Sequence, residues 1–273
     1  MQACVPELGA RPMVGTVDGY QQIVRNLERT LGTITKRPEV KRDADYYLAN
    51  IRSVTNVEEF LKNDRLYNFA MTAFGLKDMI FGKAFMRKVL TEGIDGENSF
   101  ALQLADSRFR DFAEAFNFAR YGATAMAFDR AQQGTVDRFV RVQLESDAGQ
   151  KDEGLRLALY FQRKTPAVTS VFGLMGDAAL YKVVQTALGL PAALSGADID
   201  KQAALISSKL DIADLKEPEK LNKFIVRFTA QWQAVNGNAA QSAPFVGLSR
   251  SPLTTFDNSL LLSLQVLNQR SFR

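Results

Sequence analysis

The sequence predicts an all-α, multihelical fold made of two diverged tandem helical repeats, at about residues 46–118 and 160–232, joined by connecting helices. Residues 46–76 align without a gap with residues 160–190, and ten aligned positions are identical, which indicates an internal duplication. Apolar residues recur at spacings of three and four through both copies, as in amphipathic helices. Neither strand alternation nor a hairpin turn signal interrupts this pattern.

Residues that favour the starts and ends of helices predict the elements of the first copy. Residues 14–42 predict an N-terminal helix and a loop that carries Lys and Arg. Gly75 stands where a left-handed helix C-terminus is expected, and Asp78 is a candidate start for the next helix, which Gly93 ends. Asp106 is a natural N-cap for the following helix.

The second copy repeats these signals after residues 119–159, which predict one or two connecting helices. Gly189 ends a helix, and Asp198 or Asp200 can cap the next one. Pro218 suits the first position of a last long helix.

The ends of the chain have different compositions. We expect residues 1–13 to be a flexible leader, with Met13 as an alternative start, and residues 14–235 to form the helical domain. Residues 236–255, rich in Asn, Gln, Ser, Pro, Gly and Ala, predict a linker, and residues 256–273 a leucine-rich C-terminal helix.

The composition argues against several classes of protein. The chain has one cysteine, Cys4, and no histidine, so we expect no intrachain disulfide, no zinc site and no histidine-dependent nucleophile. The net charge of +4 comes from scattered basic groups, which argues against a nucleic-acid partner. No apolar run reaches the roughly 20 residues of a membrane span.

Two motif-like segments do not meet the requirements of their chemistry. Gly82-Lys83-Ala84 lacks the glycine spacing and the hydroxyl of a phosphate-binding loop. The segment beginning at Asp198 lacks the glycine and the final glutamate of a calcium loop. We therefore predict no cofactor, metal or catalytic residue.

Helically spaced apolar side chains could line a ligand pocket, but core packing is the better interpretation. These side chains are Phe69, Phe81, Phe85, Met86, Phe109, Phe112 and Phe116.

The leucine-rich end of the chain carries the candidate partner-docking residues. It either packs on the protein's own core or docks into a partner, as amphipathic helices do. The docking candidates are Phe256, Leu260, Leu261, Leu264 and Leu267.

Several segments resemble one known family. They read YYLANI at residues 46–51, AFGL at 73–76, KAFMRKVL at 83–90, FAEAFNF at 112–118 and ALYFQRK at 158–164. These segments are similar to the alphaproteobacterial family known as domain of unknown function 1217. The resemblance implies a multihelical fold, genes often found among flagellar genes, and no assigned activity or catalytic residue.

The leading hypothesis is a non-enzymatic interaction protein with a protein partner, such as a flagellar component. We expect it in the cytoplasm, with a place beside the flagellar base as the finer expectation. The alternative is a small-molecule binder or histidine-independent enzyme with a pocket between the repeats, where Tyr67, Tyr181, Lys83 or Arg87 would converge. A weak nucleic-acid binder is the least favoured hypothesis.

Overall fold

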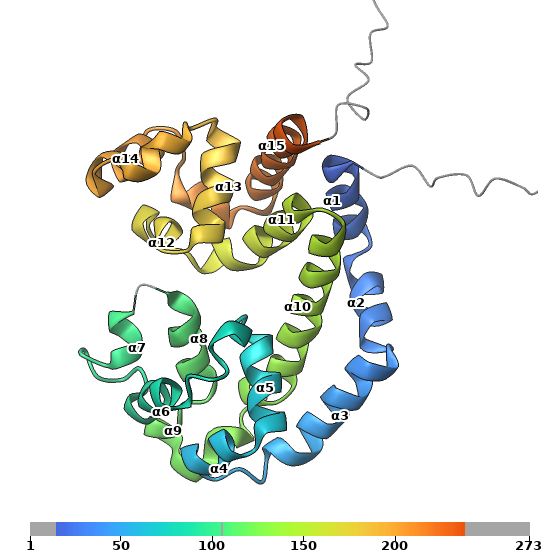
Figure 1. Ribbon diagram of the computed structural model, residues 1–273, viewed down its shortest axis with the longest axis vertical. Coiled ribbons are helices and arrows are strands. Elements are labelled where there is room, and N and C mark those ends of the chain that lie inside the picture. The colour runs from blue at the N-terminus through green and yellow to red at the C-terminus, as the bar shows by residue number, and fades with distance from the viewer. Residues whose placement is uncertain (1–14, 105, 238–273) are drawn as a thin grey trace, which may run out of the picture. The chain divides into compact units, whose positions relative to one another are not determined.

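The computed structural model describes residues 15–104 and 106–237, where every regular element is a helix (Figure 1), which confirms the all-α prediction. The α-helices are α1 (Thr16–Arg25), α2 (Leu27–Thr35), α3 (Pro38–Ile51), α4 (Val57–Lys62), α5 (Asp64–Ala73), α6 (Lys83–Glu92), α7 (Phe100–Gln103), α8 (Ser107–Ala115), α9 (Phe118–Tyr121), α10 (Gln133–Lys151), α11 (Glu153–Lys164), α12 (Val171–Met175), α13 (Ala178–Leu188), α14 (Ile199–Ser207) and α15 (Pro218–Asn236). The 3-10 turns are η1 (Lys77–Met79), η2 (Gly122–Ala127), η3 (Asp129–Ala131), η4 (Thr165–Ala167), η5 (Ala192–Gly196) and η6 (Ile212–Lys216).

The helix C-termini at Gly75 and Gly189 have the same local structure. Both glycines adopt left-handed backbone angles, with φ of 73° and 64°. In each case the glycine N–H and the N–H of the following leucine bond back into the last helical turn, at 2.8–3.1 Å. This is the Schellman arrangement, which satisfies carbonyls that the helix end leaves free. The two predicted helix ends are thus confirmed.

The helix N-termini of the two aligned segments correspond as well. The side chains of Asn56 and Ser170 cap α4 and α12, and those of Asn63 and Asp177 cap α5 and α13. Each pair occupies aligned positions of the two segments. The correspondence is the outcome that an internal duplication would give, and the duplication itself stays a prediction.

Two predictions about the first half are wrong. The helix expected from Asp78 begins only at Lys83, because residues 77–79 form the 3-10 turn η1. The expected Lys/Arg loop does not form, since Pro38 opens α3 as its first residue. Its fixed φ angle suits that position, and the basic residues that follow become part of the helix.

The core forms where α10 packs against α2, α5 and α11, and where α11 packs against α13 and α15. In the first half, Phe60, Phe112 and Phe116 are fully buried, and the last two rings lie 4.8 Å apart. The predicted core packing is confirmed for the helical phenylalanines, with Phe85 partly buried beside them. It is wrong for Phe81, which is 97% exposed.

Candidate functional site

A cavity of about 470 Å³ lies between α8, α10, α11 and the beginning of α13. A cavity of this size suits a small molecule. Its wall has both apolar and polar parts, and the charged residues in it are Asp106, Arg108, Glu145, Arg156, Arg163 and Asp177.

Helix α11 supplies one face of the cavity. Arg156, Tyr160 and Arg163 follow each other at spacings of four and three, so they lie on one side of the helix. The fully buried Ala158 and Phe161 lie on the other side of the helix, in the core. The helix thus presents a polar stripe to the cavity and an apolar stripe to the interior.

Arg163 forms a two-pronged ion pair with Glu145 of α10. Its Nε and Nη2 atoms donate to the two carboxylate oxygens at 2.6 and 2.8 Å. The side chains are only 19% and 7% exposed. Burial opposes the charge on Arg163, but the bonds and charge of Glu145 outweigh it and raise the pKa of this arginine. The two short bonds fix the pair in position.

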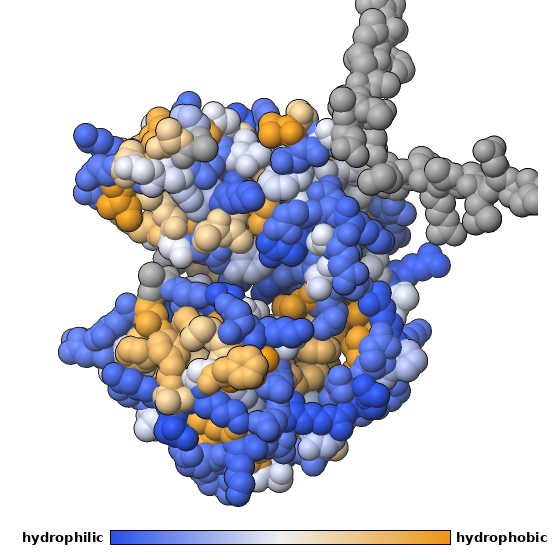
Figure 2. Space-filling model, viewed as in Figure 1, coloured by the Kyte–Doolittle hydropathy of each residue, from blue (hydrophilic) through white to orange (hydrophobic). Residues whose placement is uncertain are grey.

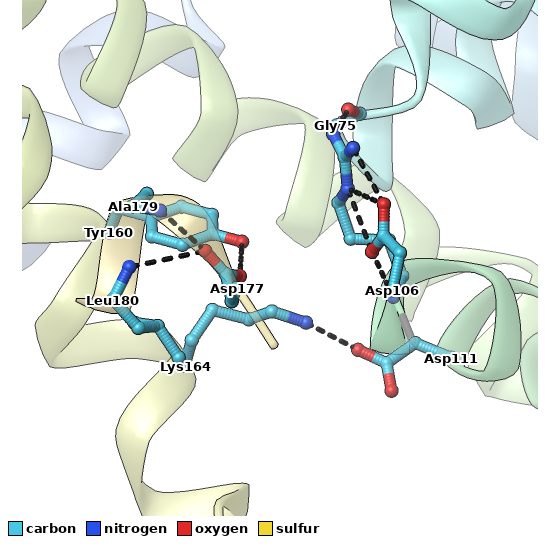
Figure 3. A network of polar contacts seen from close by, with 9 residues as sticks. Gly75, Asp106, Asp111, Tyr160, Lys164, Asp177, Ala179 and Leu180 are labelled. Atoms are coloured by element: carbon cyan, nitrogen blue, oxygen red, sulfur yellow. Dashed lines mark hydrogen bonds and ion pairs between the residues drawn. The ribbon is translucent and has the colours of Figure 1, made fainter. Parts of the chain in front are cut away.

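A second group of contacts comes from α8 (Figure 3). Arg108 donates to both oxygens of Asp106 and to the carbonyl oxygen of Gly75, which joins α8 to the end of α5. Burial opposes ionisation of Asp106, yet the bonds from Arg108 prevail and lower its carboxyl pKa. Beside this group, Lys164 of α11 reaches Asp111 of α8 at 2.6 Å, with both side chains largely buried.

The beginning of α13 completes the wall. The Asp177 carboxylate accepts hydrogen bonds from the backbone N–H groups of Ala179 and Leu180, and the Tyr160 hydroxyl donates to it at 2.6 Å (Figure 3). Burial, together with the Asp177 charge, raises the pKa of Tyr160, so its hydroxyl stays protonated. Asp177 therefore caps α13 and ties it to α11 at once.

The cavity presents hydrogen-bonding side chains next to apolar surface. Its charged side chains are held in pairs rather than as a carboxylate and a free base facing one reacting atom. Within residues 15–104 and 106–237, no group of His, Cys, Asp and Glu has the arrangement to hold a metal ion.

The residues that the sequence suggested for a pocket do not line this cavity. Lys83 pairs with Asp64 at 2.5 Å, and Arg87 forms a two-pronged pair with Glu58 at 2.5 and 3.0 Å. These two cations belong to exposed ion pairs that α6 makes with α4 and α5.

The two suggested tyrosines lie apart from the cavity as well. The Tyr181 hydroxyl donates to Gln202 at 2.5 Å. Burial raises the pKa of Tyr67 to about 12, and its hydroxyl has no hydrogen-bond partner among the described residues. Sequence reasoning thus missed the cavity residues, although the stripe of Arg156, Tyr160 and Arg163 was a usable signal.

A second surface feature lies over α6 and α7, where apolar side chains gather (Figure 2). Phe81 is 97% exposed and Leu102 41% exposed. Phe85 and Phe100 are partly buried, with ring centroids 5.0 Å apart, where α6 packs against α7. Ile80, Phe81, Phe85, Phe100 and Leu102 are called the α6–α7 patch below. The predicted docking residues 256–267 lie outside the described part of the chain, as do the predicted leader and most of the linker.

The chain is similar to a known protein family and to a protein of known structure. The family model described as "Protein of unknown function (DUF1217)" matches residues 73–221. The X-ray crystal structure of protein AGR_C_984 from Agrobacterium tumefaciens is similar, with 39% sequence identity and a TM-score of 0.76. The similarity covers 85% of this chain and 100% of that one. No curated protein matches. The family match spans more than half of the chain and the solved relative spans most of it, so the chain belongs to the DUF1217 family of proteins of unknown function.

Proposed function

We propose that this chain is a non-enzymatic helical interaction protein that acts in flagellar assembly or function, in the cytoplasm beside the flagellar base. The observation that supports the interaction is the α6–α7 patch, in which Phe81 is 97% exposed. A phenylalanine ring left in water gives up the free energy of burial, and clustered exposed apolar side chains often mark a contact surface. The flagellar part comes from the gene neighbourhoods that the family resemblance implies.

The occupant that fits this patch is an apolar segment of a partner protein, such as the apolar face of a helix. Phe81 precedes α6, whereas Phe100 and Leu102 belong to α7, so two elements present the side chains. The packed rings of Phe85 and Phe100 hold the base of the patch in place. The patch therefore offers a fixed surface on which a partner can bury Phe81.

The first prediction concerns Phe81→Asp, tested by swimming in a deletion strain of the native host that carries the variant gene. We expect the wild-type gene to restore swimming and Phe81→Asp to reduce it, because a charge cannot be buried against an apolar partner. Val235→Asp is the matched control, since Val235 is 77% exposed and lies on α15. Flagellar proteins should co-purify with wild type and Val235→Asp, and be depleted with Phe81→Asp.

Normal swimming of the deletion strain would contradict the flagellar role, and equal partner recovery by both variants would contradict the role of the patch. A chain that ends at Gln241 tests the other docking prediction, because it lacks the C-terminal leucine-rich segment. Loss of the partner from that chain alone would assign docking to Phe256, Leu260, Leu261, Leu264 and Leu267.

A second candidate function is favoured by the cavity between α8, α10, α11 and α13. We propose, as the alternative, that the chain binds a small molecule there. The cavity is lined by residues of both aligned segments, because Gly75 lies near the end of the first segment and Tyr160 begins the second. A screen of small molecules by thermal denaturation tests this candidate, since a ligand that binds only the folded chain raises its melting temperature.

A further inference from the structure

The carboxylates in the cavity wall are already occupied by donors of the same chain. Both oxygens of Glu145 accept from Arg163. Both oxygens of Asp106 accept from Arg108. One oxygen of Asp177 accepts two backbone N–H groups and the other accepts the Tyr160 hydroxyl. Every carboxylate oxygen of the wall thus already accepts at least one hydrogen bond from the chain.

The arginines of α11, in contrast, retain donors. Arg156 uses Nε and Nη2 for Glu153, at 2.8 and 2.5 Å, and Glu153 is not part of the cavity wall. Arg163 uses the same two atoms for Glu145. Within the described part of the chain, the Nη1 atoms of both arginines and the hydroxyl of Ser146 make no hydrogen bond. Each Nη1 carries two N–H donors, so the free capacity of the wall is mainly that of a donor.

Three arginines lie around Glu145. Arg141, Arg156 and Arg163 surround Glu145 closely enough for its charge to act on each of their pKa values. Arg141 is itself bonded to the neutral side chain of Gln162. Burial lowers the pKa of Arg141, and the positive charge of Arg163 lowers it further. The negative charge of Glu145 acts in the opposite direction but does not outweigh them. Within the cavity wall itself, the carboxylates of Asp106, Glu145 and Asp177 balance the three arginines Arg108, Arg156 and Arg163. What the wall offers a ligand is therefore its free N–H donors and not a net positive charge.

We infer that the cavity binds an oxyanion, the phosphate or carboxylate group of a small molecule, through Arg156, Arg163 and Ser146. The inference rests on the small-molecule candidate proposed above and names its ligand class. Guanidinium groups bind both kinds of oxyanion through parallel N–H bonds, and these charge-assisted bonds are stronger than neutral ones.

The test compares wild type with Arg156→Gln and Ser146→Asp, using the full-length chain. Arg156→Gln removes one guanidinium, and the Arg156–Glu153 pair is 37% and 45% exposed, so the fold tolerates the change. Ser146→Asp places a carboxylate in the cavity wall at an exposed position without breaking an ion pair. Arg87→Gln is the matched control, because Arg87 forms the same two-pronged pair with a glutamate outside the cavity.

Binding is measured by isothermal titration calorimetry with inorganic phosphate and with succinate, at constant ionic strength set by sodium chloride. We expect one or both anions to bind wild type and Arg87→Gln, and to bind Arg156→Gln and Ser146→Asp at least about tenfold more weakly, the effect of losing a charge-assisted bond. Binding of phosphate alone would identify a phosphate-bearing ligand, and binding of succinate alone a carboxylate.

Equal affinity in all four proteins, equal loss in Arg87→Gln, or no binding of either anion would overturn the oxyanion inference. Circular dichroism of each variant separates such a result from loss of fold. A different result would contradict small-molecule binding as a whole. In that case neutral and cationic compounds, as well as the anions, would leave the melting temperature of the wild-type chain unchanged.

Discussion

Gly154, in the first turn of α11, lies directly against the indole ring of Trp232 on α15. A Cβ atom at Gly154 would stand 2.5 Å from Nε1 of Trp232, closer than real side-chain contacts allow. The same indole N–H donates to Asp152 at 3.2 Å, and Asp152 also accepts from Thr16 of α1. Three helices that are distant in sequence therefore meet where only glycine fits.

The second prediction is that Gly154→Ala destabilises the fold by about 1–3 kcal/mol, because the added methyl group forces the indole or the helix to move. Urea denaturation followed by circular dichroism and by the fluorescence of Trp232, the only tryptophan, measures the change. Gly32→Ala in α2 is the control, since a Cβ there meets nothing within 4 Å. It should stabilise the helix by about 0.5–1 kcal/mol. A Gly154→Ala chain as stable as wild type would refute the steric account.

Residue-level features were predictable from sequence where the cause is local. Phe112 and Phe116 are buried because their helical spacing puts them on the core side of α8 and its end. Phe81 had the same residue type, but it lies in the turn before α6 and not on a helix, so periodicity gives it no direction. The contact of Gly154 with Trp232 joins distant positions, for which a single sequence carries no local signal.

At the scale of helices, ends were predicted well because capping is local chemistry. Asp106, Asp198 and Pro218 begin the helices they were expected to begin. Asp78 failed because an acidic residue near a helix start also suits the 3-10 turn that forms there. Side-chain bonds beyond the cap, such as that of Tyr160 with Asp177, depend on packing and were missed.

The third prediction compares the aligned caps Asp177 and Asn63. Asn63→Ala should cost about 1 kcal/mol, since it removes one capping bond to Leu66. Asp177→Ala should cost about 2–3 kcal/mol, because it removes the cap of α13 and leaves the Tyr160 hydroxyl without its acceptor. Urea denaturation of both variants measures the difference.

Asp177→Ser separates the two contributions of Asp177. Serine can still cap α13 but is too short to keep the bond to Tyr160, so it should restore about 1 kcal/mol relative to alanine. Equal destabilisation by Asn63→Ala and Asp177→Ala would mean that the Tyr160 bond contributes nothing to stability.

At the scale of the whole molecule, the fold class and the family were predictable, whereas the cavity was not. The cavity combines side chains from α8, α10, α11 and the start of α13. The ion pair of Lys164 with Asp111 likewise links two helices whose contact no sequence pattern indicates. Within the described residues, no helix is long and apolar enough to span a membrane.

The fourth prediction is the dependence of stability on pH. The chain has no histidine, the side chain whose ordinary pKa lies between pH 5 and 8, so the free energy of unfolding should be nearly constant from about pH 6 to 8. Hydrogen bonds from Arg156 lower the pKa of Glu153, and those from Arg108, against the effect of burial, lower that of Asp106. A carboxyl group whose pKa is lower in the folded than in the unfolded chain stabilises the fold at pH values above its unfolded pKa, which is near 4. This stability is lost as the pH falls from there through the folded pKa.

The alkaline side has the opposite sign because buried phenols resist ionisation. Burial raises the pKa values of Tyr20, Tyr47 and Tyr160, and that of Tyr67 to about 12. In the unfolded chain these groups ionise near pH 10, so the stability they give is complete below pH 10 and declines as pH rises toward their folded values. Thermal unfolding between pH 3 and 11 should therefore give a plateau with a fall at each end. A step between pH 6 and 8 would contradict this account.

Tyr67→Phe isolates one phenol from this alkaline decline. The Tyr67 hydroxyl is buried and makes no hydrogen bond to any residue that the structure describes. Its removal should leave the chain as stable as wild type, or more stable, at pH 7, because no partner is left unpaired. The same variant should lose less stability than wild type between pH 9 and 11, since one fewer group ionises preferentially in the unfolded chain. An unchanged decline above pH 9 would show that Tyr67 is solvated in the native state, and that the other tyrosines account for the alkaline loss.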